Sequence, residues 1–215
     1  MSPLLVFEGI DGSGKSTLRS AVVEALHDRG RLVVGLDSPA TTFATGQLLR
    51  RALEGAVQIT PSALLWLFAA EAVEADQLVR DYLRRDYIVV MDRFTPISAY
   101  VYQSEQHSEG AIESVLSGWH FQWPHATFIM TVPPAVAVQR TLTRAKAPDV
   151  LYEHNLDAKE VRFAERQQYY RRILLLGGPH PGGPGYELDG TQPVAALVTQ
   201  VLKHLYTCGM LGTPP

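Results

Sequence analysis

A glycine-rich loop near the start of the chain limits the possible folds more than any other stretch. Residues 4–7 are apolar, residues 9–16 follow the pattern G-x-x-x-x-G-K-S, and an amphipathic segment comes next. A strand, a glycine-rich turn and a helix in this order gather backbone N–H groups and a positive helix end around one anion. We therefore predict a phosphate-binding loop, in which Gly9, Gly12 and Gly14 allow the tight turn. The alternative is an ordinary turn followed by a lysine.

Two side chains of this loop carry the chemistry that phosphates require. Lys15 follows the last glycine of the motif, where its ammonium group can reach the β- and γ-phosphates of a nucleotide. Ser16 comes next, and its hydroxyl can bind the Mg²⁺ that accompanies such phosphates. The loop thus predicts a bound polyphosphate without indicating the reaction.

The composition is that of one globular domain without a basic excess. The chain has 215 residues, 46% hydrophobic and 19% charged, with a net charge of -3. This balance argues against a dedicated nucleic-acid binder. The single cysteine excludes an internal disulfide, and the first residues lack the features of a signal peptide or a membrane span. We expect one domain over residues 1–215, located in the cytoplasm, with no nucleic-acid or membrane partner.

Apolar runs and amphipathic stretches alternate along the chain. Five runs are predicted as strands, around Phe7 and at residues 31–36, 87–91, 126–132 and 186–189. The helices are predicted from the loop to Gly30, at 47–53, 60–85, 97–121 with a break at 107–110, 134–143 and 157–176, and from Pro193 onward. Strand–helix–strand units with short connections indicate a parallel sheet. The expected fold class is α/β, a P-loop NTPase three-layer α/β/α sandwich with a five-stranded parallel sheet.

The long helix at 60–85 has an unusual first half. Thr60 and Pro61 are typical of a helix start, and residues 64–70 are apolar on nearly every side. We therefore expect this half to be buried on more than one side, either by the core or by a second subunit.

Charged residues gather at two further places. Asp92 and Arg93 follow the third predicted strand, at the carboxyl edge where parallel sheets bind ligands, although they would also suit a solvated strand end. Residues 144–152 form a basic, proline-interrupted loop. The helix after it carries four arginines: Arg162, Arg166, Arg171 and Arg172.

With these motifs in place, the sequence resembles the thymidylate kinases, a branch of the nucleoside monophosphate kinases. The resemblance extends from Phe7 to Leu205. It rests on the phosphate loop at 7–17, the Asp-Arg-aromatic motif at 92–94, an S-x-x-x-Y-Q-like run through Ser98, Tyr102 and Gln103, and the turn at 189–193 that resembles the family's adenine-bordering turn. The run through Ser98 lies one residue further along than the family pattern.

The resemblance implies transfer of the γ-phosphoryl group of ATP to a deoxynucleoside monophosphate, most closely dTMP to dTDP. Phosphoryl transfer depends on positioning and charge neutralisation. The implied catalytic residues are Lys15, Asp11, Arg93 and Arg144. The implied ATP-binding residues are Gly9, Asp11, Gly12, Ser13, Gly14, Lys15, Ser16, Thr17, Arg140 and Thr191. Ser16 is the implied Mg²⁺ ligand, and Asp92 would act through a water.

The source of the catalytic arginine follows from one loop position. Some relatives carry an arginine in the phosphate loop, where this chain has Ser13. We therefore expect a lid at about 140–156 to supply it, with Arg144 ahead of Arg140 and Lys146. A solvated helix end is the alternative explanation of these basic residues.

For the acceptor, the resemblance implies a pocket of eight residues. Phe68 would stack on the base and Tyr102 would crowd the 2′ position, although both also suit a helix core. The implied set is Asp11, Pro39, Phe68, Ala72, Arg93, Ser98, Tyr102 and Gln103.

Three departures from the family pattern concern this acceptor pocket. Ala72 stands where the family has an arginine that reads the base edge. Residues 37–40 replace an Arg-Glu-Pro-Gly-like run, so a phosphate-binding arginine is missing, and Ala99 replaces a polar residue. The residues that could compensate are Arg50, Arg51 and Glu71.

These departures leave other functions open. One is a same-fold kinase for a hydroxyl acceptor, such as a deoxynucleoside, in which Glu8 or Asp92 would be the base. Another is a kinase for a modified-base deoxynucleoside monophosphate. The third is a nucleotide-binding regulator without activity. The resemblance further implies a homodimer, and the tail at about 207–215 is expected to be loose.

Overall fold

The computed structural model describes residues 2–143, 156–175 and 185–211. The predicted basic loop, with Arg144 and Lys146, lies outside the described residues, as does the predicted glycine-rich loop that ends at residue 185, except for that last residue. Of the expected lid at about 140–156, only residues 140–143 and 156 are described. Within the described residues, none of the helices is long and apolar enough to span a membrane.

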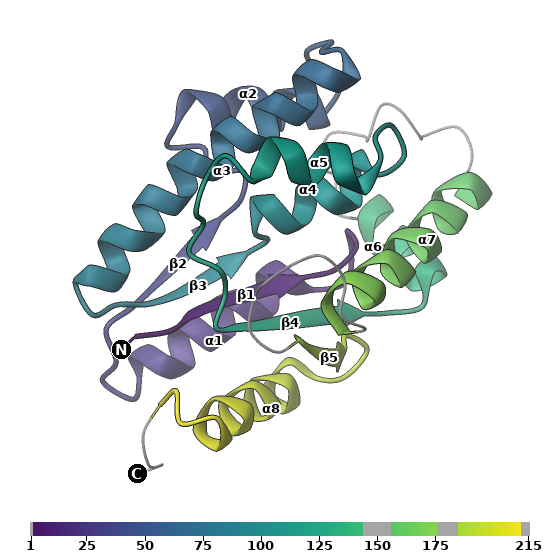
Figure 1. The fold of residues 1–215 in the computed structure, drawn as a ribbon. Coiled ribbons are helices and arrows are strands. Elements are labelled where there is room, and N and C mark those ends of the chain that lie inside the picture. The colour runs from purple at the N-terminus through teal and green to yellow at the C-terminus, as the bar shows by residue number, and fades with distance from the viewer. Residues whose placement is uncertain (1, 144–155, 176–184, 212–215) are drawn as a thin grey trace.

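The sheet has five parallel strands in the order β2-β3-β1-β4-β5, which confirms the predicted fold class (Figure 1). The phosphate-loop strand β1 therefore lies at the centre. Its neighbours come from distant parts of the chain, with Phe7 opposite Asp92 on one side and Phe128 on the other. The strands are β1 (Leu4–Glu8), β2 (Val33–Asp37), β3 (Ile88–Asp92), β4 (Ala126–Thr131) and β5 (Gly185–Asp189).

Helices cover both faces of this sheet (Figure 1). Leu5 and Phe7 point to one face and pack with residues of α1 and α8, whereas Leu4 and Val6 point to the other, with residues of α2, α3, α4, α5 and α7. This alternation along β1 is that of a strand buried on both sides. The helices are α1 (Lys15–His27), α2 (Ala44–Leu53), α3 (Pro61–Arg84), α4 (Thr95–Gln103), α5 (Glu109–Leu116), α6 (Pro134–Thr143), α7 (Leu156–Leu175) and α8 (Val194–Thr207).

The sequence predicted which segments are helices and strands more accurately than it predicted where each of them begins and ends. β2 runs from Val33 to Asp37, so the predicted strand at 31–36 began two residues early. The helical region predicted at 97–121 is two helices, but they are separated at residues 104–108 rather than at the predicted 107–110, and α5 already ends at Leu116. The segment after it is held by side chains rather than by a helical pattern, as described below.

The first half of α3 is not enclosed by the core of this chain. Its buried apolar residues recur at alternating three- and four-residue spacing: Leu65, Phe68, Ala72, Ala75 and Val79. Trp66 points away from this stripe and is 63% exposed. The expectation that the core surrounds this half is therefore wrong for the single chain. Cover by a second subunit stays a prediction.

Asp76 on α3 anchors the segment after α5. Its side chain is fully buried, and it accepts hydrogen bonds from the Trp119 indole at 2.9 Å, the Gln122 backbone N–H at 2.6 Å and the Arg80 guanidinium at 2.7 Å. One carboxylate thus satisfies three donors from two segments. This explains why an irregular stretch is ordered there.

Replacing Asp76 with alanine is expected to destabilise the fold by about 1–3 kcal/mol, because three partly exposed donors lose their shared acceptor. Thermal unfolding of Asp76→Ala measures this loss. Asp81→Ala is the matched control, since the Asp81 ion pair with Arg84 is exposed at both ends and is expected to contribute about 0–1 kcal/mol. Equal melting temperatures for the two variants would contradict the role given to Asp76.

Candidate active site

The candidate site forms where β1 and β3 end next to each other. Phe7 lies opposite Asp92 in the ladder, and the Arg93 backbone N–H donates to the Phe7 carbonyl at 2.9 Å. The glycine-rich loop and the Asp-Arg pair therefore emerge side by side at the carboxyl edge of the sheet. The order of strands changes direction around β1, and open α/β sheets bind ligands at such a point.

The glycine-rich loop has the conformation that its glycines predicted. Gly9, Gly12 and Gly14 have φ values of 137°, 80° and 101°, all in the region that disfavours other residues. A side chain at Gly9 would collide with the Met130 carbonyl, and one at Gly12 would collide with the Ala137 carbonyl. The loop is thus packed tightly against β4 and α6.

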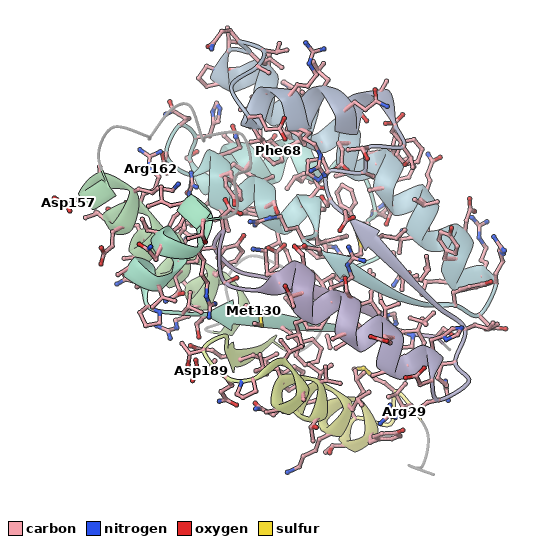
Figure 2. All side chains as sticks on the ribbon, turned by 180° about the vertical axis from the view of Figure 1, so that it is seen from behind. Arg29, Phe68, Met130, Asp157, Arg162 and Asp189 are labelled. Atoms are coloured by element: carbon pink, nitrogen blue, oxygen red, sulfur yellow. The ribbon has the colours of Figure 1, made fainter. Side chains whose placement is uncertain are left out.

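A second close approach joins this loop to the turn after β5. A Cβ atom at Gly190 would lie 2.5 Å from the Ser13 carbonyl oxygen. Arg140 on α6 spans the same gap, because its Nη1 donates to the Gly12 carbonyl at 3.3 Å and to the Gly190 carbonyl at 3.1 Å. In this structure Arg140 therefore fixes two loops to each other. Thr191 lies in the same turn, and its hydroxyl donates to Asp189. Asp189 is labelled in Figure 2.

Gly190→Ala is expected to push the turn away from the phosphate loop and to weaken ATP binding about tenfold, since overpacking costs about 1–3 kcal/mol. Calorimetric titration with ATP measures the change. Gly110→Ala is the control, because Gly110 lies in α5 with no atom within 4 Å of the added Cβ. If Gly190→Ala bound ATP as tightly as Gly110→Ala, the close approach of Gly190 to the phosphate loop would not contribute to ATP binding.

Lys15 is buried and already hydrogen-bonded. Its side chain donates to the Ile10 carbonyl at 2.8 Å, and the residue is 6% exposed. Burial and the nearby charge of Arg93 lower the pKa of Lys15 to about 8. A phosphate in the loop would take over the Ile10 interaction and favour the protonated lysine.

This pKa predicts how ATP binding changes with pH. Below pH 8 the Lys15 ammonium is already charged, so the affinity is expected to vary little on this account. Above pH 8 the lysine must take up a proton when ATP binds, and the affinity falls by up to about tenfold per pH unit. Titrations between pH 7 and 9.5 test this. Lys15→Arg should remove the break near pH 8, and a flat wild-type profile would contradict the assignment.

Ser16 and Asp92 are in direct contact. The Ser16 hydroxyl donates to the Asp92 Oδ2 atom, whereas Oδ1 is buried and accepts no hydrogen bond within the described part of the chain. A hydroxyl and a carboxylate with a vacant oxygen are suitable oxygen ligands for Mg²⁺. The residues present therefore fit the implied metal.

Arg93 is the centre of the site. Its φ of 71° is unusual for a residue with a side chain and directs the guanidinium back over the loop. Nη2 donates to Asp11 Oδ1 at 2.5 Å, and Nη1 donates to the Tyr170 hydroxyl at 3.0 Å. Glu8 supports this turn, because its Oε1 atom accepts the Phe94 backbone N–H at 2.8 Å and Oε2 lies 3.8 Å from Arg93 Nη1.

The two acids beside Arg93 have opposite pKa shifts. Burial raises the pKa of Glu8, and the charge of Arg93 offsets only part of this rise. Burial would also raise the pKa of Asp11, but nearby positive charges outweigh it and lower that pKa to about 2. The cations that act on Asp11 are, in order, Arg93, Lys15 and Arg166. Asp11 is therefore ionised at neutral pH.

The predicted acceptor residues come from α3, α4 and the loop after β2. Phe68 and Ala72 are 1% and 2% exposed and belong to the core cluster that also holds Ala99 (Figure 2). Ser98 and Gln103 on α4 are buried. Each has a side-chain oxygen that no described residue satisfies. Tyr102 lies beside Arg93, with the guanidinium carbon 5.4 Å from its ring centroid.

Glu71 joins the loop after β2 to α3. It is buried, and its Oε1 atom accepts the Ala40 backbone N–H at 2.7 Å. Its other oxygen accepts the Thr95 hydroxyl, which also contacts the Ser38 hydroxyl. This network fixes the segment around Pro39. Burial raises the pKa of Glu71.

Several residues at the site are absent from the predicted set. Tyr170 and Arg166 come from α7, a polar helix whose sequence pattern does not show which arginine faces the site. Glu8 had a signal, since it is an acid inside a buried strand, and it was considered only as a base for a hydroxyl acceptor. No feature of the sequence around Thr95 indicates that it lies at the site.

Fold and site together define the class of protein. The protein is a P-loop nucleotide phosphotransferase by three features. These are a central parallel strand, a phosphate loop with a buried lysine, and an Asp-Arg pair at the end of the neighbouring strand.

Comparison with known proteins narrows this class to one family. The family model for thymidylate kinase matches residues 7–174. The chain is 31% identical to a thymidylate kinase of Bordetella petrii over 94% of this chain and 93% of the relative. It is 30% identical to that of Dinoroseobacter shibae, over 94% and 95% of the two chains, and 34% identical to that of Leptospira borgpetersenii, over 79% and 80%. The chain belongs to the thymidylate kinase family, whose members are nucleoside monophosphate kinases that use ATP.

Proposed function

We propose that this chain transfers the γ-phosphoryl group of ATP to dTMP, yielding dTDP and ADP. The curated relatives are named thymidylate kinase, and they match nearly the full chain. The geometric observation that supports the proposal most is the ion pair of Arg93 with Asp11 at 2.5 Å. It holds a guanidinium between the donor phosphate loop and the residues expected to bind the acceptor.

In the proposed reaction an oxygen of the dTMP phosphate attacks the γ-phosphorus of ATP. A new P–O bond forms, the bond to the β-phosphate oxygen breaks, and ADP leaves. The acceptor oxygen is already anionic, so no strong base is required. Lys15 neutralises the donor phosphates, and Arg93 bridges donor and acceptor, where negative charge accumulates in the transition state. Asp11 orients Arg93.

The remaining expectations belong to this proposal. Ser16 and Asp92 would hold Mg²⁺, which supplies positive charge beside the donor phosphates. Arg144, in the proposed lid at about 140–156 of a single domain, would add a further cation. A homodimer that covers exposed Trp66 on α3 and a cytoplasmic location are also proposed.

A panel of acceptors tests the proposed function. Full-length protein is supplied with Mg·ATP and, separately, dTMP, dUMP, dCMP, dGMP, thymidine or no acceptor, and ADP release is followed. We expect dTMP to give the highest kcat/KM, with dUMP the nearest competitor because it differs by one methyl group. Turnover with thymidine alone would support a hydroxyl acceptor. ATP binding with no turnover for any acceptor would support a regulator.

A further inference from the structure

The site contains a second arginine that the phosphate loop and the Asp-Arg motif do not account for. Arg166 on α7 places its guanidinium carbon 4.5 Å from the centre of the Tyr102 ring, and Arg93 lies 5.4 Å from the centre of the same ring. Its charge also acts on Asp11, the partner of Arg93. Two guanidinium groups and one carboxylate therefore gather around Tyr102.

Arg166 is largely shielded from solvent but incompletely paired. Its side chain is 11% exposed, and its Nε atom has no hydrogen-bond acceptor within the described ranges. Its ion pair with Glu105 is loose at 3.6 Å, because the other oxygen of Glu105 is bound by Arg162 at 3.0 Å. A shielded cation with unused donors is costly unless an anion binds it.

The segment after β2 carries no arginine of its own, but a cation reaches it from α2, because the Arg50 guanidinium donates to the Pro39 carbonyl at 3.2 Å and its Nε atom has no acceptor within the described residues. The segment after β2 begins with Asp37, and this carboxylate is paired with Arg19 of α1 at 2.5 Å. Residues 37–40 contain no arginine, so the positive charge around an acceptor phosphate has to come from other elements, among them Arg50 of α2.

We infer that Arg166 binds the phosphate of the acceptor nucleotide together with Arg93. This inference rests on the proposed function, because it assumes an acceptor that carries a phosphate. The planar guanidinium suits the task, since it can donate two hydrogen bonds to one phosphate while it stays stacked on Tyr102.

Arg166→Met tests the inference by binding rather than by turnover. The dissociation constants of dTMP and thymidine are measured by calorimetry in the absence of ATP. We expect dTMP binding to weaken about 10- to 100-fold, the loss typical of a charged hydrogen bond. Thymidine binding should change less than threefold. Arg166→Lys should recover part of the dTMP affinity, because lysine keeps the positive charge. The recovery should be incomplete, because lysine lacks the planar guanidinium that donates two hydrogen bonds to one phosphate.

Arg162→Met is the matched control. Arg162, which is labelled in Figure 2, is one turn before Arg166 on α7. Both arginines pair with Glu105. The control should leave both dissociation constants within threefold of wild type. Melting temperatures verify that the variants are folded.

Two results would overturn the inference. One is unchanged dTMP binding in Arg166→Met. The other is an equal loss for dTMP and thymidine, which would assign Arg166 a structural role. A wild-type protein that binds thymidine as tightly as dTMP would instead refute the proposed function, and this inference with it.

Discussion

Lys15→Met is expected to lower kcat by about 10³-fold with Mg·ATP and dTMP, the upper range for removal of one preorganised transition-state contact. Lys15 is 6% exposed and lies inside the glycine-rich loop, so neither water nor a neighbouring cation can replace its ammonium group at the same place. Methionine fills a similar volume without the charge. Initial rates at saturating substrates measure the effect.

The control for this variant is Lys203→Met, which removes an exposed lysine of α8 and should leave kcat unchanged. Circular dichroism and thermal melting show that Lys15→Met is folded. If it kept more than a tenth of the wild-type kcat, Lys15 would not be a catalytic group.

Arg93→Met is expected to lower kcat/KM for dTMP by about 10³-fold or more, since the arginine bridges donor and acceptor in the proposed transition state. The loss should appear in kcat as well as in the KM for dTMP. Part of the effect comes from the carboxylates left behind, because Asp11 loses its 2.5 Å partner. Steady-state kinetics with dTMP varied at fixed Mg·ATP separate the two parameters.

Arg84→Met is the matched control for Arg93→Met. Its guanidinium is exposed and pairs with Asp81 on the same helix, so both kinetic parameters should stay near wild type. If Arg93→Met changed only the KM for dTMP, Arg93 would bind the acceptor without taking part in the chemical step.

The donor half of the site could be predicted because its signals are local. Glycine spacing, Lys15 and Ser16 lie within eight consecutive residues, and backbone sterics translate that spacing directly into a loop conformation. Asp92 and Arg93 could be added because parallel strands end at one edge. The fold class followed from the alternation of strands and helices.

The acceptor half depends on tertiary contacts that a single sequence does not encode locally. Arg166 and Tyr170 meet the site because α7 packs against β4, β5 and α4, and the four arginines of that helix have similar surroundings in the sequence. The partners of Glu8 and Asp76 were likewise invisible, because the two carboxylates bind backbone groups more than forty residues away in the chain. An acidic residue in a buried position indicates that it has a hydrogen-bond or ion-pair partner, but not which residue that partner is.

The exposed side of α3 is a further feature that the sequence alone did not predict. Residues 64–70 are apolar on nearly every side, yet the helix buries only one stripe and leaves Trp66 exposed. Hydrophobic periodicity gives the face that packs on the core. It does not distinguish a second buried face from a surface that another molecule covers.

The identity of the product tests the central claim most directly. Full-length protein is incubated with Mg·ATP and dTMP, and the nucleotides are followed by ³¹P NMR. We predict that ADP and dTDP appear in equal amounts while ATP and dTMP disappear together. Formation of ADP without dTDP, or conversion of thymidine but not dTMP, would contradict the account.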